Sequence, residues 1–138
     1  MQPQSPSGYR EIPHTADWEL EVWAPDLTTL LEQAAHGMYH LCEARLVSQP
    51  RITRRIELTF NELETLLVDF LSELLFLTES EGLAFDEFNL QIANNRLNAD
   101  ITGADLKSLA KEIKAVTYHN INIRDTGSEM KANIVFDV

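Results

Sequence analysis

Residues near both ends of the chain have side chains that could carry chemistry. His14 and Asp17 lie three residues apart just before a predicted strand, and Asp137 is the penultimate residue. The Asp137 side chain and the terminal carboxylate of Val138 can lie close together, and such paired oxygens attract Ca²⁺, Mg²⁺ or Mn²⁺. In the alternative interpretation, Asp17 only accepts hydrogen bonds from nearby amides in a local turn.

A second pair of carboxylates lies on a predicted helix. Asp69 and Glu73 are four residues apart, so they share one helix face. Buried carboxylates must be paired, protonated or metal-bound, so this pair could ligate a hard cation or hold a proton. If that face meets water instead, the two acids are ordinary surface residues.

Lysine and histidine side chains are further candidates. Lys114 stands at a predicted helix-to-strand junction, where its ammonium group could contact a carboxylate or phosphate of a partner or simply be solvated. His14 or His119 could act as the general base of a hydrolase. His36 and His40 have the spacing of metal ligands, but the segment between them lacks the glutamate of a HExxH protease. The sequence has no glycine-rich phosphate loop and no GxSxG nucleophile elbow.

One long helix dominates the predicted fold. Residues 61–77 carry leucine, valine and phenylalanine around most of the helix circumference, which predicts that other elements pack around it. Asn61 followed by Glu64 is typical of a capping box, and Gly82 suits the left-handed closing position. Asp69 and Glu73 inside the run exclude a membrane span, which needs about 20 nearly uncharged residues.

Alternating apolar residues predict several strands. These runs occupy residues 9–12, 18–23, 51–60 and 131–138. Two further runs, 88–92 and 97–101, meet at Asn94 and Asn95, which predicts a tight hairpin because asparagine tolerates positive φ.

Two more helices are predicted. Thr29 and Glu32 form a capping box for a helix with an apolar stripe. Helical spacing predicts a short third helix after Gly103, through Leu106, Leu109, Ala110 and Ile113. The predicted fold class is α+β: a single domain at residues 9–138, with a mixed, mostly antiparallel sheet packed with two long helices and one short helix. Residues 1–8 are predicted to be a disordered tail.

The composition limits the classes of partner. The 138 residues include 22 acidic and 11 basic side chains, for a net charge of −11. A negative surface disfavours direct binding to nucleic acid and favours cations or basic partners. Cys42 is the only cysteine, so no internal disulfide can form, and no leader segment is predicted. We therefore expect a cytoplasmic protein that binds neither nucleic acid nor a membrane directly.

Four segments together resemble the archease family. They are HTAD at residues 14–17, LLVDFLSELLFL at 66–77, KAVTYH at 114–119 and the penultimate Asp137. They occur in the family's order and span nearly the whole chain after the first eight residues.

The resemblance implies a non-catalytic accessory protein. Archeases activate an RtcB-type RNA ligase, which uses GTP and Mn²⁺ in tRNA splicing and RNA repair, by promoting its guanylylation and multiple turnover. By resemblance, Lys114 and His14 are functional or partner-contact residues. The implied metal site, with Ca²⁺ favoured and Mg²⁺ or Mn²⁺ as alternatives, consists of Asp17, Asp137 and the terminal carboxylate of Val138. Asp69, Glu73 and His119 could lie around these ligands and hold them in place without binding the metal themselves. Two other classes stay open, a metal-dependent hydrolase and a chaperone-like interaction module.

Overall fold

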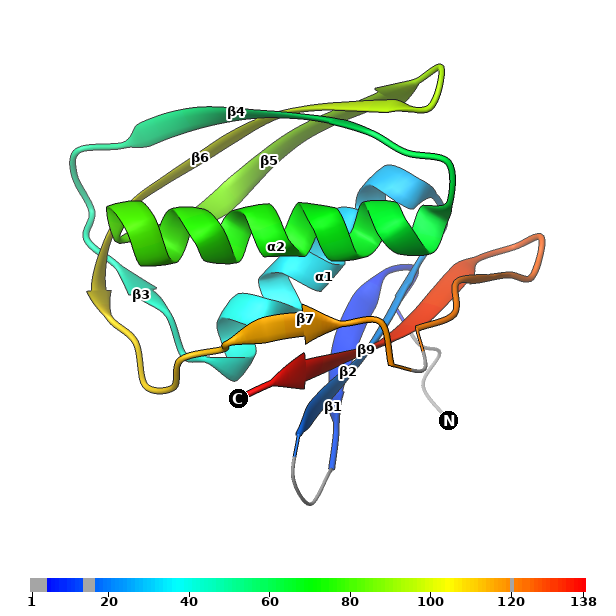
Figure 1. Ribbon diagram of the computed structural model, residues 1–138, viewed down its shortest axis with the longest axis horizontal. Coiled ribbons are helices and arrows are strands. Elements are labelled where there is room, and N and C mark those ends of the chain that lie inside the picture. The colour runs from blue at the N-terminus through cyan, green and yellow to red at the C-terminus, as the bar shows by residue number, and fades with distance from the viewer. Residues whose placement is uncertain (1–4, 14–16, 120) are drawn as a thin grey trace.

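The computed structural model describes residues 5–13, 17–119 and 121–138. Figure 1 shows the arrangement of the helices and strands. In chain order the elements are β1 (Gly8–Ile12), β2 (Trp18–Ala24), α1 (Leu27–Leu41), β3 (Arg45–Leu46), β4 (Ile52–Thr59), α2 (Leu63–Glu81), β5 (Leu83–Ala93), β6 (Arg96–Ser108), β7 (Ala115–Thr117), β8 (Arg124–Asp125) and β9 (Met130–Asp137). The predicted α+β class is confirmed.

The strands form two sheets, whereas the sequence predicted one mixed sheet. The first has the order β1-β2-β9-β7, with β8 also paired to β9. The second is built on β6, which pairs with β3, β4 and β5. Every strand pairing among the described residues is antiparallel.

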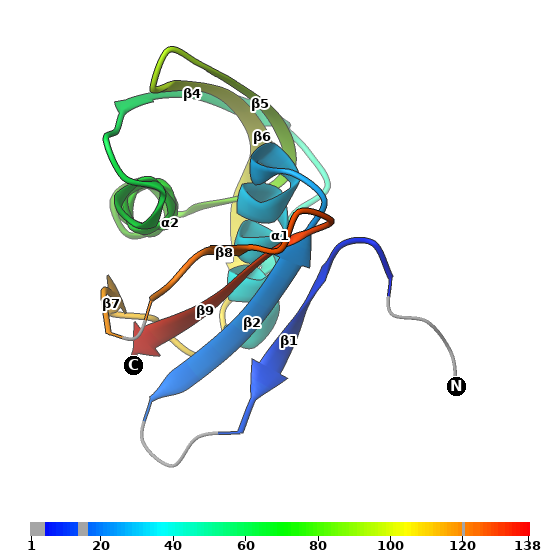
Figure 2. The same cartoon turned by 90° about the vertical axis from the view of Figure 1, so that its right-hand side faces the viewer.

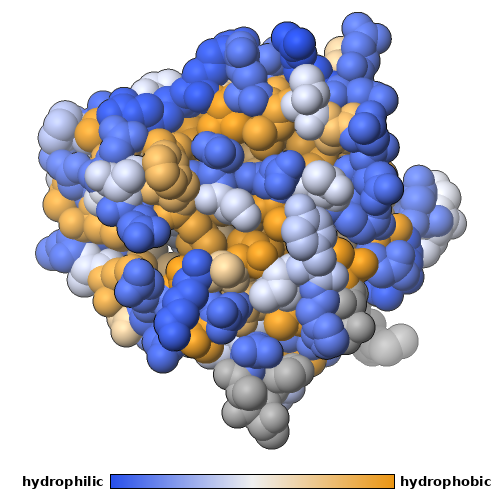
Figure 3. Space-filling view, in the orientation of Figure 1, coloured by the Kyte–Doolittle hydropathy of each residue, from blue (hydrophilic) through white to orange (hydrophobic). Residues whose placement is uncertain are grey.

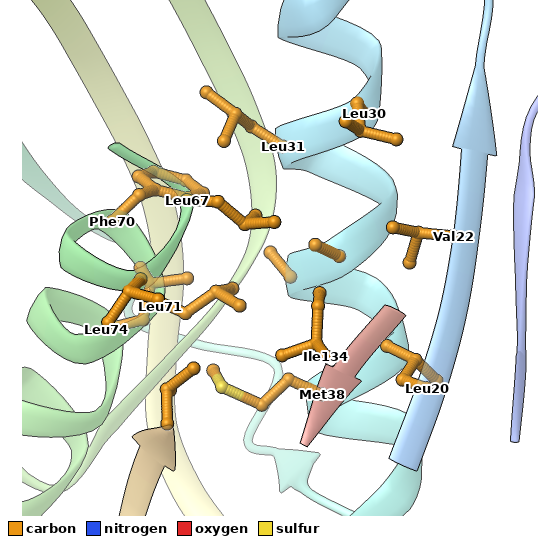
Figure 4. Packing of buried hydrophobic residues seen from close by; sticks show 14 of the residues in the cluster. Leu20, Val22, Leu30, Leu31, Met38, Leu67, Phe70, Leu71, Leu74 and Ile134 are labelled. Carbon is orange, nitrogen blue, oxygen red and sulfur yellow. The ribbon is translucent and has the colours of Figure 1, made fainter. Parts of the chain in front are cut away.

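The two helices lie between the two sheets (Figures 1 and 2). Helix α2 packs against β4, β5 and β7, and α1 packs against β1, β2 and β5. Leu67 of α2 points toward α1 (Figure 4), whereas the Phe70 ring lies 6.3 Å from the ring of Phe88 in β5 of the second sheet. Leu67, Phe70, Leu71 and Leu74 of α2 have no exposed surface, so the prediction that this helix is enclosed is confirmed.

Both predicted capping boxes are wrong, although both long helices exist. Helix α1 is capped by Asp26, whose Oδ1 accepts the Thr29 amide at 2.9 Å. Helix α2 has Glu62 at its N-cap position, without a side-chain cap hydrogen bond. The Glu64 carboxylate instead accepts the Ile123 amide at 3.0 Å, so tertiary contact replaces the local cap. At the other end Gly82 has φ 68°, as predicted for the closing residue.

The predicted third helix does not form among the described residues. Leu106 belongs to β6, and its amide donates to the Gly82 carbonyl at 2.8 Å. Residues 109–114 have no regular structure. Strands β3 and β5 both pair with this part of β6, and these non-local hydrogen bonds decide against a helix.

The predicted hairpin and N-terminal strand are present. Asn94 and Asn95 have φ values of 53° and 57° between β5 and β6, as a two-residue type I′ turn requires. Strand β1 begins at Gly8, and the Trp23 indole donates to the Ser5 carbonyl at 2.8 Å. The assignment of residues 1–8 to a disordered tail stays a prediction.

Candidate metal and partner site

Strand β9 lies beside both segments that carry the other candidate residues. Trp18 of β2 pairs with Phe136 of β9; Asp17 precedes the first, and Asp137 follows the second. Because the strands are antiparallel, Asp17 and Asp137 lie at the same end of the pair, although they come from opposite ends of the sequence. The metal site that the resemblance implies requires this arrangement of the two backbones, and ligation by the two side chains stays a prediction.

Lys114 reaches the same place from the other side of β9. Ala115 of β7 pairs with Asp137, and the Lys114 amide donates to the Asp137 carbonyl at 2.8 Å. Both side chains are exposed. Asp137 thus lies between the segment of Asp17 and the segment of Lys114. These three residues are candidates that the sequence analysis had identified.

The chain terminus is positioned by packing. The Val138 side chain is partly buried against the hydrophobic core, and the terminal carboxylate of this residue is the expected third donor. The two aspartates and this carboxylate are hard oxygen donors, the set that Ca²⁺, Mg²⁺ and Mn²⁺ take. Within the described part of the chain no group of three His, Cys, Asp or Glu side chains could hold a metal. A cation beside the two aspartates would take further oxygen donors, and the one expected from the sequence analysis is the terminal carboxylate of Val138.

The other candidate residues lie elsewhere or cannot be placed. His14 lies outside the described residues. His119 is exposed beyond the far end of β7, where its amide donates to Thr117 Oγ1 at 3.2 Å. Asp69 is half-buried and Glu73 is exposed on α2. No hydrogen bond or ion pair between described residues joins either acid to the Asp17–Asp137 pair.

His36 and His40 have structural contacts in place of a metal. His36 Nε2 lies 3.6 Å from Glu32, and its ring packs edge-on against Phe88 with centroids 5.2 Å apart. The His40 ring lies 5.6 Å from that of Tyr9. Both histidines therefore make packing contacts on one flank of α1.

A solvent-open groove adjoins Lys114. It lies between the C-terminal half of α2 and the segment leading into β7, and its volume is about 430 Å³. We call it the α2 groove; the lining residues that matter below are Leu75, Phe76, Glu79, Leu109, Glu112 and Lys114. Apolar side chains gather on this face of the molecule (Figure 3).

The floor of the α2 groove is neutral. Tyr39 and Cys42, which also line it, lie near the end of α1. Burial raises the pKa of the Tyr39 hydroxyl and of the Cys42 thiol, so both stay protonated at neutral pH. None of the described residues lining the groove is a histidine, so His14 and His119, the general-base candidates of the sequence analysis, are not among its described lining residues.

The sequence analysis did not predict the α2 groove, although a signal for it is present. Phe76 follows Ser72 by four residues and Glu73 by three, so it falls on the polar stripe of α2. An aromatic side chain on a polar helix face is unusual, and Phe76 is 60% exposed. The other wall comes from Leu109 and Ile113, whose spacing had suggested a helix.

Strand β4 of the second sheet differs from the groove because its two arginines are paired with acids. Arg54 binds Glu81 with a nitrogen–oxygen distance of 2.7 Å, and Arg55 lies 3.2 Å from Asp100. The hydrogen bond from Arg54 lowers the pKa of Glu81. Among the described residues, no helix has the length and apolar character needed to cross a membrane.

The chain is similar to proteins of one family over almost its full length. The model of the Archease protein family (MTH1598/TM1083) matches residues 9–138. "Protein archease" of Methanosarcina barkeri is 36% identical over 139 aligned residues, which cover 94% of this chain and 95% of the relative. "Protein archease" of Methanothermobacter thermautotrophicus is 29% identical, with 95% and 99% covered.

Two solved structures share the fold. The crystal structure of an archease, described as a possible chaperone, from Thermotoga maritima has a TM-score of 0.70 and 25% identity, with 94% of this chain and 96% of that chain covered. The solution structure of protein 1598 of Methanobacterium thermoautotrophicum has a TM-score of 0.69 and 28% identity, with 95% and 99% covered.

Proposed function

This chain belongs to the archease family, and from that premise we propose that it is a non-catalytic activator of an RtcB-type RNA ligase. In this role it promotes the metal- and GTP-dependent guanylylation of the ligase and so permits multiple turnover in tRNA splicing or RNA repair. The observation that carries the proposal is the meeting of Asp17, Asp137 and Lys114 at one end of the first sheet.

The acidic end of this sheet would hold a divalent cation. Asp17, Asp137 and the carboxylate of Val138 are three anionic donors that repel one another unless a cation lies between them. Ca²⁺ is the favoured ion, with Mg²⁺ or Mn²⁺ as alternatives. When bound, such a cation would offset the charge that develops on a transferring phosphoryl group.

Lys114 would act on the partner and not on the cation. Its exposed ammonium group lies next to the acidic end, so it can pair with a carboxylate or phosphate at the ligase active site. The net charge of −11 supports docking on a basic RNA-binding enzyme without competition for its RNA. We expect the protein to act in the cytoplasm.

A guanylylation time course with the ligase tests the proposal. Asp17→Ala, Asp137→Ala and a chain extended beyond Val138 should each lose stimulation while circular dichroism shows a folded domain. Asp105→Ala, which removes an exposed aspartate from the second sheet, is the matched control and should stimulate normally. Calorimetric titration with Ca²⁺, Mg²⁺ and Mn²⁺ measures metal binding separately. Folded variants that stimulate at the wild-type rate would contradict the proposal.

The α2 groove favours a second candidate function, a chaperone-like module that binds apolar segments of client proteins. The Thermotoga relative is described as a possible chaperone. Such a module would bind clients without metal, whereas the ligase activator would not act without it. Chelation of divalent metals during a client-binding assay and during the guanylylation assay separates the two functions.

A further inference from the structure

We propose that the α2 groove is the docking surface for a basic amphipathic segment of the partner protein, with an apolar side chain in the groove and Lys or Arg on both sides of it. The inference rests on the proposed function, because it takes the partner to be the ligase. In this proposal the groove supplies the affinity for the ligase, and the acidic end of the first sheet activates its guanylylation.

The first argument is the distribution of exposed apolar surface. The large apolar side chains left exposed in the described part of the chain are Phe76, Leu109 and Tyr118, at 60%, 36% and 57%. Two of these three, Phe76 and Leu109, line the α2 groove from opposite sides. An exposed aromatic ring beside a concave apolar surface is typical of the residues that dominate binding energy at interfaces.

The second argument is charge. Glu79 and Glu112 are exposed carboxylates that line the groove, and neither has a hydrogen bond or ion pair with another described residue. By contrast Glu81, two residues beyond Glu79, is held by Arg54. The two free acids outnumber Lys114, the lysine that lines the same groove, and so favour a segment with basic residues beside its apolar anchor.

The same charges argue against other occupants. A second copy of the chain would bring a net charge of −11 against an identical one, and self-association would meet that repulsion. A small molecule needs polar groups that fix its orientation. Here the Thr78 hydroxyl already donates to the Leu83 carbonyl at 2.6 Å and the Tyr39 hydroxyl is buried, so the polar groups open to an occupant are chiefly the charged side chains at the rim, which suit a charged segment.

The size and place of the groove fit a docking role. Its volume of about 430 Å³ lies within the range of about 300–1,000 Å³ common for binding sites. Lys114 lines the groove, and its amide is bonded to Asp137. A segment bound in the groove would therefore bring the neighbouring part of the ligase to the acidic end of the first sheet.

The test is an affinity measurement kept separate from the activation measurement. Biolayer interferometry with the immobilised ligase should give a Kd raised about 10-fold or more by Phe76→Ala. At saturating protein, the same variant should still stimulate guanylylation at the wild-type maximal rate. Tyr118→Ala, which removes an exposed ring outside the groove, is the matched control and should bind normally.

Charge reversal tests the basic character of the segment. The doubly reversed chain Glu79→Lys/Glu112→Lys should bind more slowly and lose most of the salt dependence of association. Glu62→Lys is the matched control, because it lies at the other end of α2, about 25 Å from Glu79 along the helix axis. Circular dichroism melts verify that each variant is folded.

The outcomes separate this inference from the proposed function. Groove variants that bind as tightly as the wild type overturn the docking surface and leave the activator function intact. Tight binding with lost stimulation after Asp137→Ala, together with weak binding and full maximal stimulation after Phe76→Ala, supports both. A wild-type chain that neither binds nor stimulates the ligase overturns both.

Discussion

The backbone amide of Lys114 donates to the carbonyl of Asp137 at 2.8 Å, so the proposed partner-contact residue is tied through the main chain to a proposed metal ligand. This bond continues the β7–β9 pairing by one residue, since Ala115 is paired with Asp137. The side chain of Lys114 plays no part in the bond. Its ammonium group is exposed and can be altered without loss of the pairing.

Lys114→Ala should therefore separate activation from stability. The variant keeps the amide, so its free energy of unfolding should change by less than about 0.5 kcal/mol. Its stimulation of ligase guanylylation should fall about 10-fold or more, because a charge-assisted contact to the partner is lost. Lys111→Ala, in the same exposed segment, is the control and should behave as wild type. Full stimulation by Lys114→Ala would remove Lys114 from the mechanism.

Leu71→Ala tests whether α2 is the central core element. Leu71 has no exposed surface, so truncation should lower the free energy of unfolding by about 2–5 kcal/mol through lost burial and a residual cavity. Phe76→Ala removes a larger side chain from the same helix, but its ring is 60% exposed. Its cost should stay below about 1 kcal/mol. Chemical unfolding midpoints measure both, and equal effects would contradict the burial argument.

Local sequence patterns correctly predicted the elements that are determined by residues close together in the chain. The alternation of Leu20 and Val22 marked β2, and the two asparagines at 94 and 95 marked the hairpin, because both signals act within a few residues. Helix α2 was predicted for the same reason. Its closing residue, Gly82, was identified from its tolerance of positive φ.

The features of the fold that depend on pairing with residues far away in the sequence could not be predicted from local patterns. The end of β6 was predicted as a helix because Leu106, Leu109 and Ile113 have helical spacing, yet β3 and β5 hold its backbone in a sheet. The approach of Asp17 to Asp137 follows from the register of β2 with β9, which no local pattern encodes. Only the resemblance to a family had linked these residues beforehand.

The N-cap of α1 gives a prediction for pH dependence. Hydrogen bonds from Thr29, chiefly, and from the Thr28 hydroxyl lower the pKa of Asp26 below its ordinary value of 3.8. The pKa of Asp26 is lower in the folded state than in the unfolded state. The ionised cap therefore stabilises the fold fully at pH values above the pKa of Asp26 in the unfolded state. This stabilisation is lost as the pH falls through the folded pKa.

Asp26→Ala should lower the free energy of unfolding by about 1 kcal/mol at neutral pH. This difference from wild type should shrink on acidification from about pH 5 to about pH 2. Asp26→Asn is the matched control, since asparagine caps about as well and does not titrate. Urea unfolding across the pH range checks the result; a difference for Asp26→Ala that is constant with pH would contradict the role of the ionised cap.

The buried hydroxyl of Tyr39 provides the last prediction. The Phe85 backbone and the Thr78 side chain lie close enough to counteract part of the rise in its pKa, but neither forms a hydrogen bond of normal geometry with it, and no other described residue does. An unpaired buried hydroxyl costs about 1–3 kcal/mol, so Tyr39→Phe should raise the free energy of unfolding by about 1 kcal/mol. Thr78→Val is the matched comparison, because it removes a hydroxyl that donates to the Leu83 carbonyl at 2.6 Å. That variant should lose about 1 kcal/mol. Thermal and urea unfolding of both variants decide the matter: if Tyr39→Phe loses as much stability as Thr78→Val, the Tyr39 hydroxyl is satisfied by a bound water and is not unpaired.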